Sequence, residues 1–259
     1  MSLQIKDLTF SYHKNHCPIL QNVSCRFEPG RFYGIFGANG GGKSSLLKLA
    51  AGELDSHGAV ELEGKNINNF TPREKALLLA VAAQENEQIL PFTVKQSIQL
   101  GRYAHGDDGS EAVEKLLDEW NMRHLSDRQF SDLSGGEQQR VKLLRVLAQD
   151  TKYLLLDEPA SSLDWTRQLE LYEKLHNLAH NLAKCIIMVC HDLYLSPGFI
   201  DEMLLLKDGN LVYFGRPDTL QAEQAISQAF DRSLSIKRSD NAVNISWQVK
   251  KINIQANQL

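Results

Sequence analysis

The sequence predicts an α/β fold built on a mainly parallel sheet. Short apolar runs alternate with helical patterns late in the chain, at YLLLDEP (153–159), WTRQLELYEKLHNLAH (165–180) and KCIIMVCHD (184–192). Strands that are apolar throughout are covered on both faces, and helices between them make parallel pairing the expected arrangement. A strand, a glycine-rich loop and a helix also follow one another within residues 31–52, which is typical of the same class.

The amino-terminal part shows a different pattern. Apolar and polar residues alternate at LQIKDLTF (3–10) and VSCRF (23–27), and AVELEG (59–64) ends in glycine like the arm of a hairpin. A period of two residues indicates strands with one buried face. We therefore expect an antiparallel β subdomain here.

Residues 88–149 are predicted to be helical. A T-x-x-Q capping box opens TVKQSIQL (93–100), and a 3.6-residue period runs through EAVEKLLDEW (111–120) and GEQQRVKLLRVLAQ (136–149). The pattern predicts a helical subdomain inserted into the α/β core. Beyond it, Asp208 and Gly209 mark the turn of a hairpin.

Composition and charge exclude several classes of function. The 259 residues are 42% apolar and 23% charged, with a net charge of −4, so the basic footprint of a nucleic-acid-binding protein is missing. The longest apolar runs, such as ALLLAVAA (76–83), fall short of the ~20 residues that a membrane span needs. We expect neither a nucleic-acid partner nor an exported or membrane-inserted chain.

Cysteine and histidine do not indicate a metal centre. The four cysteines contain no C-x-x-C pair and are predicted to be reduced thiols of a cytosolic protein. His13, His16 and Cys17 lie close in sequence, but a polar loop explains them equally well. His176 and His180 share a helix face, yet Asn177 follows the first of them where the zinc-protease pattern needs glutamate.

The stretch FGANGGGKSS (36–45) fits the phosphate-loop pattern G-x-x-x-x-G-K-[ST] from Gly37 to Ser44. Consecutive backbone N–H groups bind phosphate oxygens in such a loop, and side chains would block that approach. Lys43 would reach the β- and γ-phosphates of a nucleotide, and the Ser44 hydroxyl would bind Mg²⁺. The predicted nucleotide-binding residues of this loop are Gly37, Asn39, Gly40, Gly41, Gly42, Lys43, Ser44 and Ser45. The α/β fold is therefore expected to be that of a P-loop NTPase of the RecA-like type.

Two carboxylates, Asp157 and Glu158, end the apolar run LLLDEP. The carboxyl ends of parallel strands are where open α/β sheets bind their ligands. Asp157 would hold Mg²⁺, and Glu158 would orient and activate the attacking water. For this pair taken alone, the alternative is a structural role, because acidic residues often end strands and cap helices.

A third motif, LSGGE, places glycines at the start of a long helix, where free N–H groups make a second anion site. LSGGE, the phosphate loop and LLLDEP together resemble the ATP-binding cassette (ABC) transporter ATPases, and the resemblance covers about residues 3–225. It implies an ATPase domain over residues 1–230. The catalytic core would comprise 1–87 and 150–230 and the helical subdomain 88–149, with a tail at 231–259 whose alternating segment could add an edge strand.

The resemblance implies roles for four further residues. Tyr12 would stack on adenine, and Gln84 would contact Mg²⁺ and the attacking water. Asp164, in the loop SSLD, would communicate with the second copy across the interface of a dimer. His191 would touch the γ-phosphate. The alternatives are a strand-end tyrosine, an exposed loop glutamine, a helix-capping aspartate and a structural histidine. Lys43, Gln84, Glu158 and His191 form the expected catalytic set.

The resemblance also implies partners. Two copies would face head to tail, so that Ser134, Gly135 and Gly136 of one copy complete the ATP site of the other. With no membrane span and one cassette, the chain would be a separate subunit bound to integral membrane permeases at the cytoplasmic face of the inner or plasma membrane, with a substrate-binding protein in the complex.

The expected cargo rests on the stretches LPFTV (90–94) and LGRY (100–103), which resemble ATPases that serve uptake of iron-siderophore, haem and vitamin B12, and also of manganese and zinc. A metal-chelate importer is the prediction. The alternatives are a manganese or zinc importer, an exporter, a soluble ABC protein that acts on ribosomes or DNA, and a nucleotide-binding scaffold without catalysis.

Overall fold

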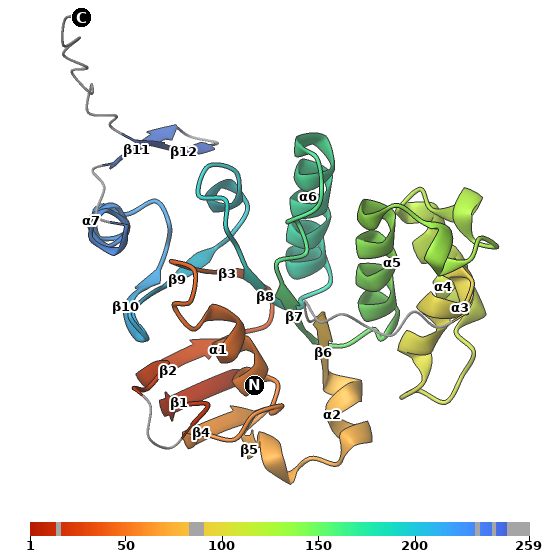
Figure 1. Ribbon diagram of the computed structural model, residues 1–259, viewed down its shortest axis with the longest axis horizontal. Helices are drawn as coiled ribbons and strands as arrows, with labels where there is room; N and C mark the ends of the chain where they lie inside the picture. Colours follow the sequence, from red (N-terminus) through yellow and green to blue (C-terminus); the bar gives the residue numbers. More distant parts are fainter. Residues whose placement is uncertain (14–16, 83–90, 231–233, 240–241, 248–259) are drawn as a thin grey trace, which may run out of the picture.

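The computed structural model describes residues 1–13, 17–82, 91–230, 234–239 and 242–247. Two sheets with flanking helices form the body of the molecule, and a group of helices extends from one side of it (Figure 1). The helices are α1 (Lys43–Ala50), α2 (Pro72–Leu78), α3 (Val94–Gln99), α4 (Ser110–Glu119), α5 (Gly135–Ala148), α6 (Trp165–Asn181) and α7 (Leu220–Ala229). The short 3₁₀ turns are η1 (Ile67–Asn69), η2 (Leu100–Arg102), η3 (Arg123–Leu125), η4 (Phe130–Asp132) and η5 (Ser196–Gly198).

The larger sheet has six strands in the order β10-β9-β3-β8-β7-β6. All neighbouring pairs are parallel except β9 and β10, which form the predicted hairpin around Asp208 and Gly209. Its strands are β3 (Arg31–Gly37), β6 (Leu79–Ala82), β7 (Tyr153–Asp157), β8 (Cys185–Val189), β9 (Glu202–Lys207) and β10 (Asn210–Gly215). The prediction of a mainly parallel sheet is confirmed.

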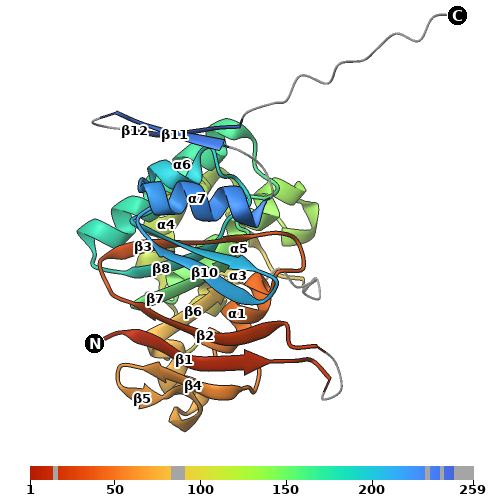
Figure 2. The same ribbon diagram turned by 90° about the vertical axis from the view of Figure 1, so that its left-hand side faces the viewer.

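The smaller sheet is antiparallel, in the order β2-β1-β4-β5, which confirms the predicted amino-terminal layer. Figure 2 shows it on one side of the larger sheet, with α6 and α7 on the other. Its strands are β1 (Leu3–Phe10), β2 (Leu20–Phe27), β4 (His57–Leu62) and β5 (Lys65–Asn66).

The central strands contribute side chains to two hydrophobic cores, one on each face of the larger sheet. On β7, Leu154 and Leu156 pack toward α5, α6 and α7, whereas Tyr153 and Leu155 pack toward α1 and the antiparallel sheet. Successive side chains of a strand point to opposite faces, so a strand covered on both faces must be apolar at every position. This is the physical reason for the unbroken apolar runs in the sequence.

The helices α3, α4 and α5 lie together on the side of the molecule away from the antiparallel sheet (Figure 1). The predicted capping box of α3 is present: the Thr93 side chain accepts from the Gln96 N–H, and the Gln96 side chain accepts from the Thr93 N–H. Helix α5 is followed in the sequence by β7. The strand that ends in Asp157 is therefore connected to this helical group by a short link.

The tail departs from the expectation of an added edge strand. The alternating segment forms β12 (Ala242–Trp247), but it pairs with β11 (Leu234–Ser239) in a separate two-stranded sheet. Pairing with a neighbouring segment closes only a short loop, which costs less conformational entropy than reaching a distant edge.

The cysteines are free thiols, as predicted. Cys25, Cys185 and Cys190 are buried, and burial raises the pKa of each thiol. Cys17 is exposed. Within the described residues, no group of three or more histidine, cysteine or acidic side chains has the geometry of a metal site, and no helix combines the length and apolar character required to cross a bilayer.

Candidate active site

The glycine loop connects β3 to α1 along a path that only glycine can follow. Gly37 and Gly42 have φ angles of +148° and +91°. A Cβ on Gly37 would stand 2.4 Å from the Leu206 carbonyl oxygen, and one on Gly42 would stand 2.7 Å from Leu20 Cδ2. Gly42 is also the N-cap of α1 and has no side chain to cap it. The first N–H groups of α1 are therefore directed toward whatever occupies the loop.

An open pocket of about 440 Å³ lies against this loop. It brings together residues between β1 and β2, the glycine loop with the start of α1, and residues that follow β7 and β8. The lining residues are Tyr12, Ile19, Asn39, Gly40, Gly42, Lys43, Ser44, Ser45, Glu158 and His191. Most of the predicted site residues thus meet in one place. Ile19 was not predicted, because an apolar residue just before a strand carries no signal for a ligand.

Lys43 is held against the loop by its own backbone. Its Nζ donates to the carbonyl oxygens of Gly37 and Ala38, each at 3.0 Å, and the side chain is buried. Burial lowers the pKa of the ammonium, and the nearby Glu158 and Asp157 carboxylates oppose that shift. Phosphate oxygens could replace the two carbonyl oxygens as acceptors without moving the lysine far.

Ser44 and Asp157 join the start of α1 to the end of β7. The Ser44 hydroxyl donates to Asp157 Oδ1 at 3.1 Å. Asp157 is buried, and burial raises the pKa of its carboxyl, with Glu158 adding to the shift and the Ser44 hydrogen bond opposing it. A hydroxyl and a carboxylate are oxygen ligands of the kind that Mg²⁺ uses, usually together with phosphate oxygens of a substrate. The residues present therefore fit a magnesium ion.

The buried Asp157 carboxylate should cost the nucleotide-free protein stability. Because its folded pKa is raised, the folded state holds the proton more tightly than the unfolded state, and this group's contribution to stability falls as pH rises from the unfolded toward the folded pKa. The penalty is complete above that window. We expect Asp157→Asn, which can still accept from Ser44, to raise the melting temperature at pH 7 by about 2–4 °C. A lower melting temperature in calorimetry would contradict this.

Glu158 follows Asp157 in a strained turn. Its φ is +52°, and its carbonyl oxygen accepts from the N–H and the hydroxyl of Ser161 at 3.2 and 3.0 Å. A positive φ is costly for a residue with a side chain, and such strain often marks a functional position. The Glu158 carboxylate contacts His191 Nε2 in an ion-pair geometry. His191 reaches it because β7 and β8 are adjacent and parallel, with Asp157 opposite Val189.

Tyr12 borders the pocket from the end of β1. Its hydroxyl lies 3.2 Å from Ser45 Oγ, and its ring packs edge-to-face against Phe10 with centroids 4.8 Å apart. The side chain is 54% exposed, so the ring is available to a flat ligand such as a nucleobase.

The LSGGE segment does not line this pocket. Ser134 caps α5 in a capping box with Glu137. A Cβ on Gly135 would meet nothing within 4 Å, and one on Gly136 would only touch the Ser162 carbonyl at 3.5 Å. Packing within the chain therefore does not require these two glycines, and a single chain does not bring them to the Lys43 pocket.

Asp164 lies at the amino-terminal end of α6. The Asp164 side chain accepts from the Arg167 N–H at 3.0 Å and so caps α6, as the structural alternative for this residue stated. Gln84 lies outside the described residues.

A strand, a glycine loop and a helix, with a lysine in the loop and carboxylates at the end of a neighbouring parallel strand, define the class of P-loop nucleoside triphosphatases. Comparison with known proteins gives the family: the sequence model described as ABC transporter matches residues 20–161. The chain belongs to the ABC transporter ATPases, binds ATP and is an ATPase. The family recognised from LSGGE, the glycine loop and LLLDEP is confirmed.

The relatives include two proteins called "Hemin import ATP-binding protein HmuV". That of Bordetella avium (strain 197N) is 37% identical over 229 residues, covering 84% of this chain and 87% of the relative. That of Rhodopseudomonas palustris (strain BisA53) is 34% identical over 273 residues, covering the whole of both chains. Among solved structures, a transporter assigned to the metal-chelate ABC type, in an inward-facing conformation, matches with a TM-score of 0.80. It is 23% identical and covers 96% of this chain and 98% of its own, which confirms the fold.

Proposed function

We propose that this chain is the ATP-hydrolysing subunit that powers import of a metal chelate of the haem type through a separate membrane permease. The observation that carries the ATPase part is the pocket that gathers Lys43, Ser44, Glu158 and His191 beside the buried Asp157. The cargo class is supported by relatives that are named as hemin import proteins, one of which aligns along its full length.

The described residues have distinct tasks in the proposed hydrolysis. The loop N–H groups and the positive end of α1 would bind the phosphates, and Lys43 would exchange its carbonyl acceptors for β- and γ-phosphate oxygens. Mg²⁺, held by Ser44 and Asp157, would neutralise charge that develops on the phosphates. Glu158 would hold the attacking water and accept its proton, because its carboxylate enters the pocket from the end of β7.

His191 would touch the γ-phosphate while remaining in contact with Glu158. That contact orients the carboxylate before the nucleotide arrives. Tyr12 would cover the adenine ring from the side of β1. Gln84 is proposed on sequence alone to contact Mg²⁺ and water.

A second copy would complete the site. Packing within the chain would accept a side chain at Gly135 and at Gly136, and neither residue lines the Lys43 pocket. The amino-terminal end of α5 carries a partial positive charge that suits a γ-phosphate. We therefore propose a head-to-tail dimer in which Ser134, Gly135 and Gly136 of one copy close the ATP site of the other. Asp164 would lie beside the interface between the two copies.

The remaining partners follow from the proposed import function. The subunit would bind permease subunits peripherally at the cytoplasmic face of the membrane, in a complex that includes a substrate-binding protein. The ATPase would meet the permease and not the cargo, so direction and selectivity would belong to that partner.

Affinity purification from membranes tests this proposal. Tagged Glu158→Gln protein with ATP should retain an integral membrane permease from detergent-solubilised membranes of its own organism, and untagged membranes are the control. In vesicles, the wild-type complex should take up haemin with ATP inside, and free Mn²⁺ or Zn²⁺ should not replace it. Absence of a membrane partner, or uptake of the free ions alone, would contradict the proposal.

A further inference from the structure

Two nine-residue segments of this chain share a pattern of serine, leucine and glutamine. FSDLSGGEQ (130–138) and ASSLDWTRQ (160–168) both carry serine at the second position, leucine at the fourth and glutamine at the ninth, with a small polar residue at the fifth. The first segment contains the LSGGE motif, and the second contains the SSLD loop. They lie on different parts of the chain, one before α5 and the other before α6.

Both segments fold into the same capped turn. The Leu133 N–H donates to the Phe130 carbonyl at 3.4 Å, and the Leu163 N–H donates to the Ala160 carbonyl at 3.2 Å. The polar fifth residue then caps the helix that follows. Ser134 Oγ accepts from the Glu137 N–H and Asp164 Oδ1 from the Arg167 N–H.

The glutamine at the ninth position closes each turn from inside the helix. Gln138 Nε2 donates to the carbonyl oxygens of Phe130 and Leu133 at 3.3 and 3.2 Å. Gln168 Nε2 donates to the carbonyl oxygens of Ala160 and Leu163, both at 3.1 Å. One amide nitrogen has two hydrogens, so each glutamine can make both bonds at once. We call these two arrangements the glutamine clamps.

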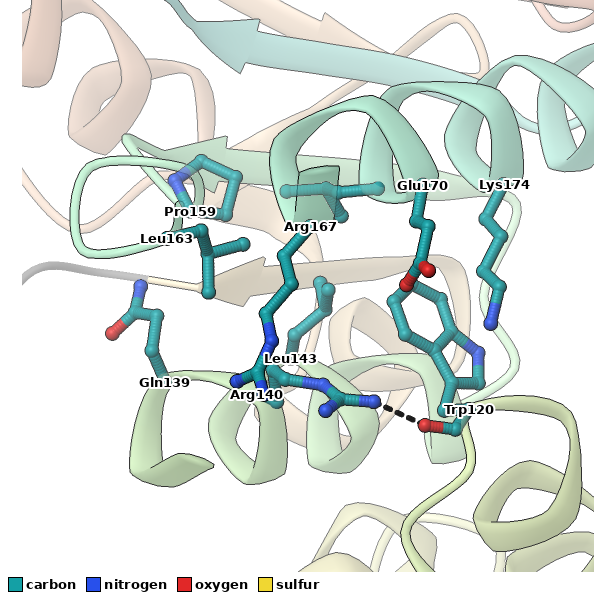
Figure 3. Close-up of a pocket in the computed structure, with 10 residues that line it drawn as sticks. Trp120, Gln139, Arg140, Leu143, Pro159, Leu163, Arg167, Glu170 and Lys174 are labelled. Carbon is teal, nitrogen blue, oxygen red and sulfur yellow. Dashed lines mark hydrogen bonds between the residues drawn. The ribbon is translucent and has the colours of Figure 1, made fainter. Parts of the chain in front are cut away.

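The two clamped turns lie next to each other. A Cβ on Gly136 would stand 3.5 Å from the Ser162 carbonyl oxygen, so this glycine of LSGGE lies beside the SSLD loop of the same chain. Just behind them, Gln139 and Arg140 of α5 lie across a narrow pocket from Leu163 and Arg167 (Figure 3). The clamps therefore fix two adjoining loops that come from different subdomains.

We propose that Gln138 and Gln168 are positioning residues for the ATP-driven association of two copies, an inference that rests on the proposed head-to-tail dimer. In each clamp, the glutamine on the helix holds two carbonyl groups of the preceding turn by hydrogen bonds. The N–H groups of the LSGGE glycines and the side of the SSLD loop then present a fixed surface to the second copy. Neither glutamine lines the Lys43 pocket, so each would act on association and not on nucleotide binding within one chain.

The test uses full-length protein carrying Glu158→Gln as the parent, with saturating Mg-ATP. Leucine at position 138 or 168 removes the donors and keeps the bulk, and glutamate keeps the shape but repels the carbonyls. Sedimentation velocity should show that Gln138→Leu, Gln138→Glu, Gln168→Leu and Gln168→Glu each raise the protein concentration for half-dimerisation by on the order of tenfold. Gln224→Leu, on the exposed face of α7, is the matched control and should not change it.

A rescue separates positioning from general damage. Lys75 Nζ bonds the carbonyls of Ala51 and Gly52 at 3.0 and 3.2 Å, so an ammonium can clamp two carbonyls in this chain. Gln138→Lys should therefore dimerise close to the parent. At protein concentrations too low for dimers, the affinity for a fluorescent ATP analogue should stay at the parental value in every variant. The melting temperature should fall by no more than about 2–4 °C, because each change removes only two part-buried hydrogen bonds.

The possible failures are distinguishable. If the parent dimerises and the leucine and glutamate variants match it, the clamps have no role in association. If the variants lose stability or nucleotide affinity in proportion to dimerisation, the glutamines are structural and the proposal is wrong. If the parent itself does not dimerise with ATP, the proposed head-to-tail function fails, and this inference fails with it.

Discussion

Glu158→Gln is expected to reduce the rate of ATP hydrolysis by roughly 10²–10³-fold while leaving ATP binding intact. The amide has nearly the shape of the carboxylate but cannot accept a proton from the attacking water. Nucleotide binding should survive because the loop, Lys43 and Ser44 are unchanged, and the two carbonyl hydrogen bonds that hold Lys43 do not involve Glu158. Phosphate release and equilibrium binding of a fluorescent ATP analogue measure the two effects separately.

The matched control is Glu173→Gln, an exposed carboxylate on α6, which should hydrolyse ATP at the wild-type rate. Retention of turnover in Glu158→Gln within about threefold of wild type would show that another group handles the water proton. His191, which contacts the same carboxylate, would then be the next residue to replace.

Lys43→Met is expected to weaken ATP binding by on the order of 10²-fold, because it removes charge-assisted hydrogen bonds to phosphate. The same variant should be at least as stable as wild type without nucleotide. Burial lowers the pKa of this ammonium, which means that holding the charge in the folded chain costs free energy. Methionine fills similar space without a charge.

Isothermal titration with ATP and thermal unfolding without it test both statements. Lys115→Met, on the exposed surface of α4, is the control for loss of a positive charge. Wild-type affinity in Lys43→Met would exclude a phosphate contact. A large loss of stability would show instead that the two carbonyl hydrogen bonds outweigh the cost of burying the charge.

Much of the fold could be predicted because its signals are local. The unbroken apolar run at 153–156 reflects a strand with a core on each face, and the Thr93 capping box is contained within four residues. The glycine loop is similar: the residues that must lack side chains and the lysine that the loop holds are within one short stretch of sequence.

The site contacts that escaped prediction are long-range or geometric. Ser44 and Asp157 were both expected at a Mg²⁺ site, but no local pattern encodes the direct hydrogen bond that joins them across 113 positions. The positive φ of Glu158 depends on the turn that follows it. The glutamine clamps require knowledge of where two carbonyls point, although the repeated spacing of leucine and glutamine was visible in the sequence.

The pairing partner of the tail strand was also not predictable from a local pattern. Alternation at residues 242–247 correctly indicated a strand but could not choose its partner. Period-two patterning defines which residues share a face, and the competition between a neighbouring strand and a distant sheet edge is decided by loop entropy and by what covers that edge.

The measurement that tests the central claim most directly is the mass of Glu158→Gln in solution with and without Mg-ATP, by sedimentation velocity. The proposed site is incomplete in one chain, because the LSGGE glycines do not line the Lys43 pocket of their own chain. The expected result is the 29.2 kDa chain without nucleotide and twice that mass with it. A single-chain mass at saturating Mg-ATP, in protein that demonstrably binds the nucleotide, would contradict the account.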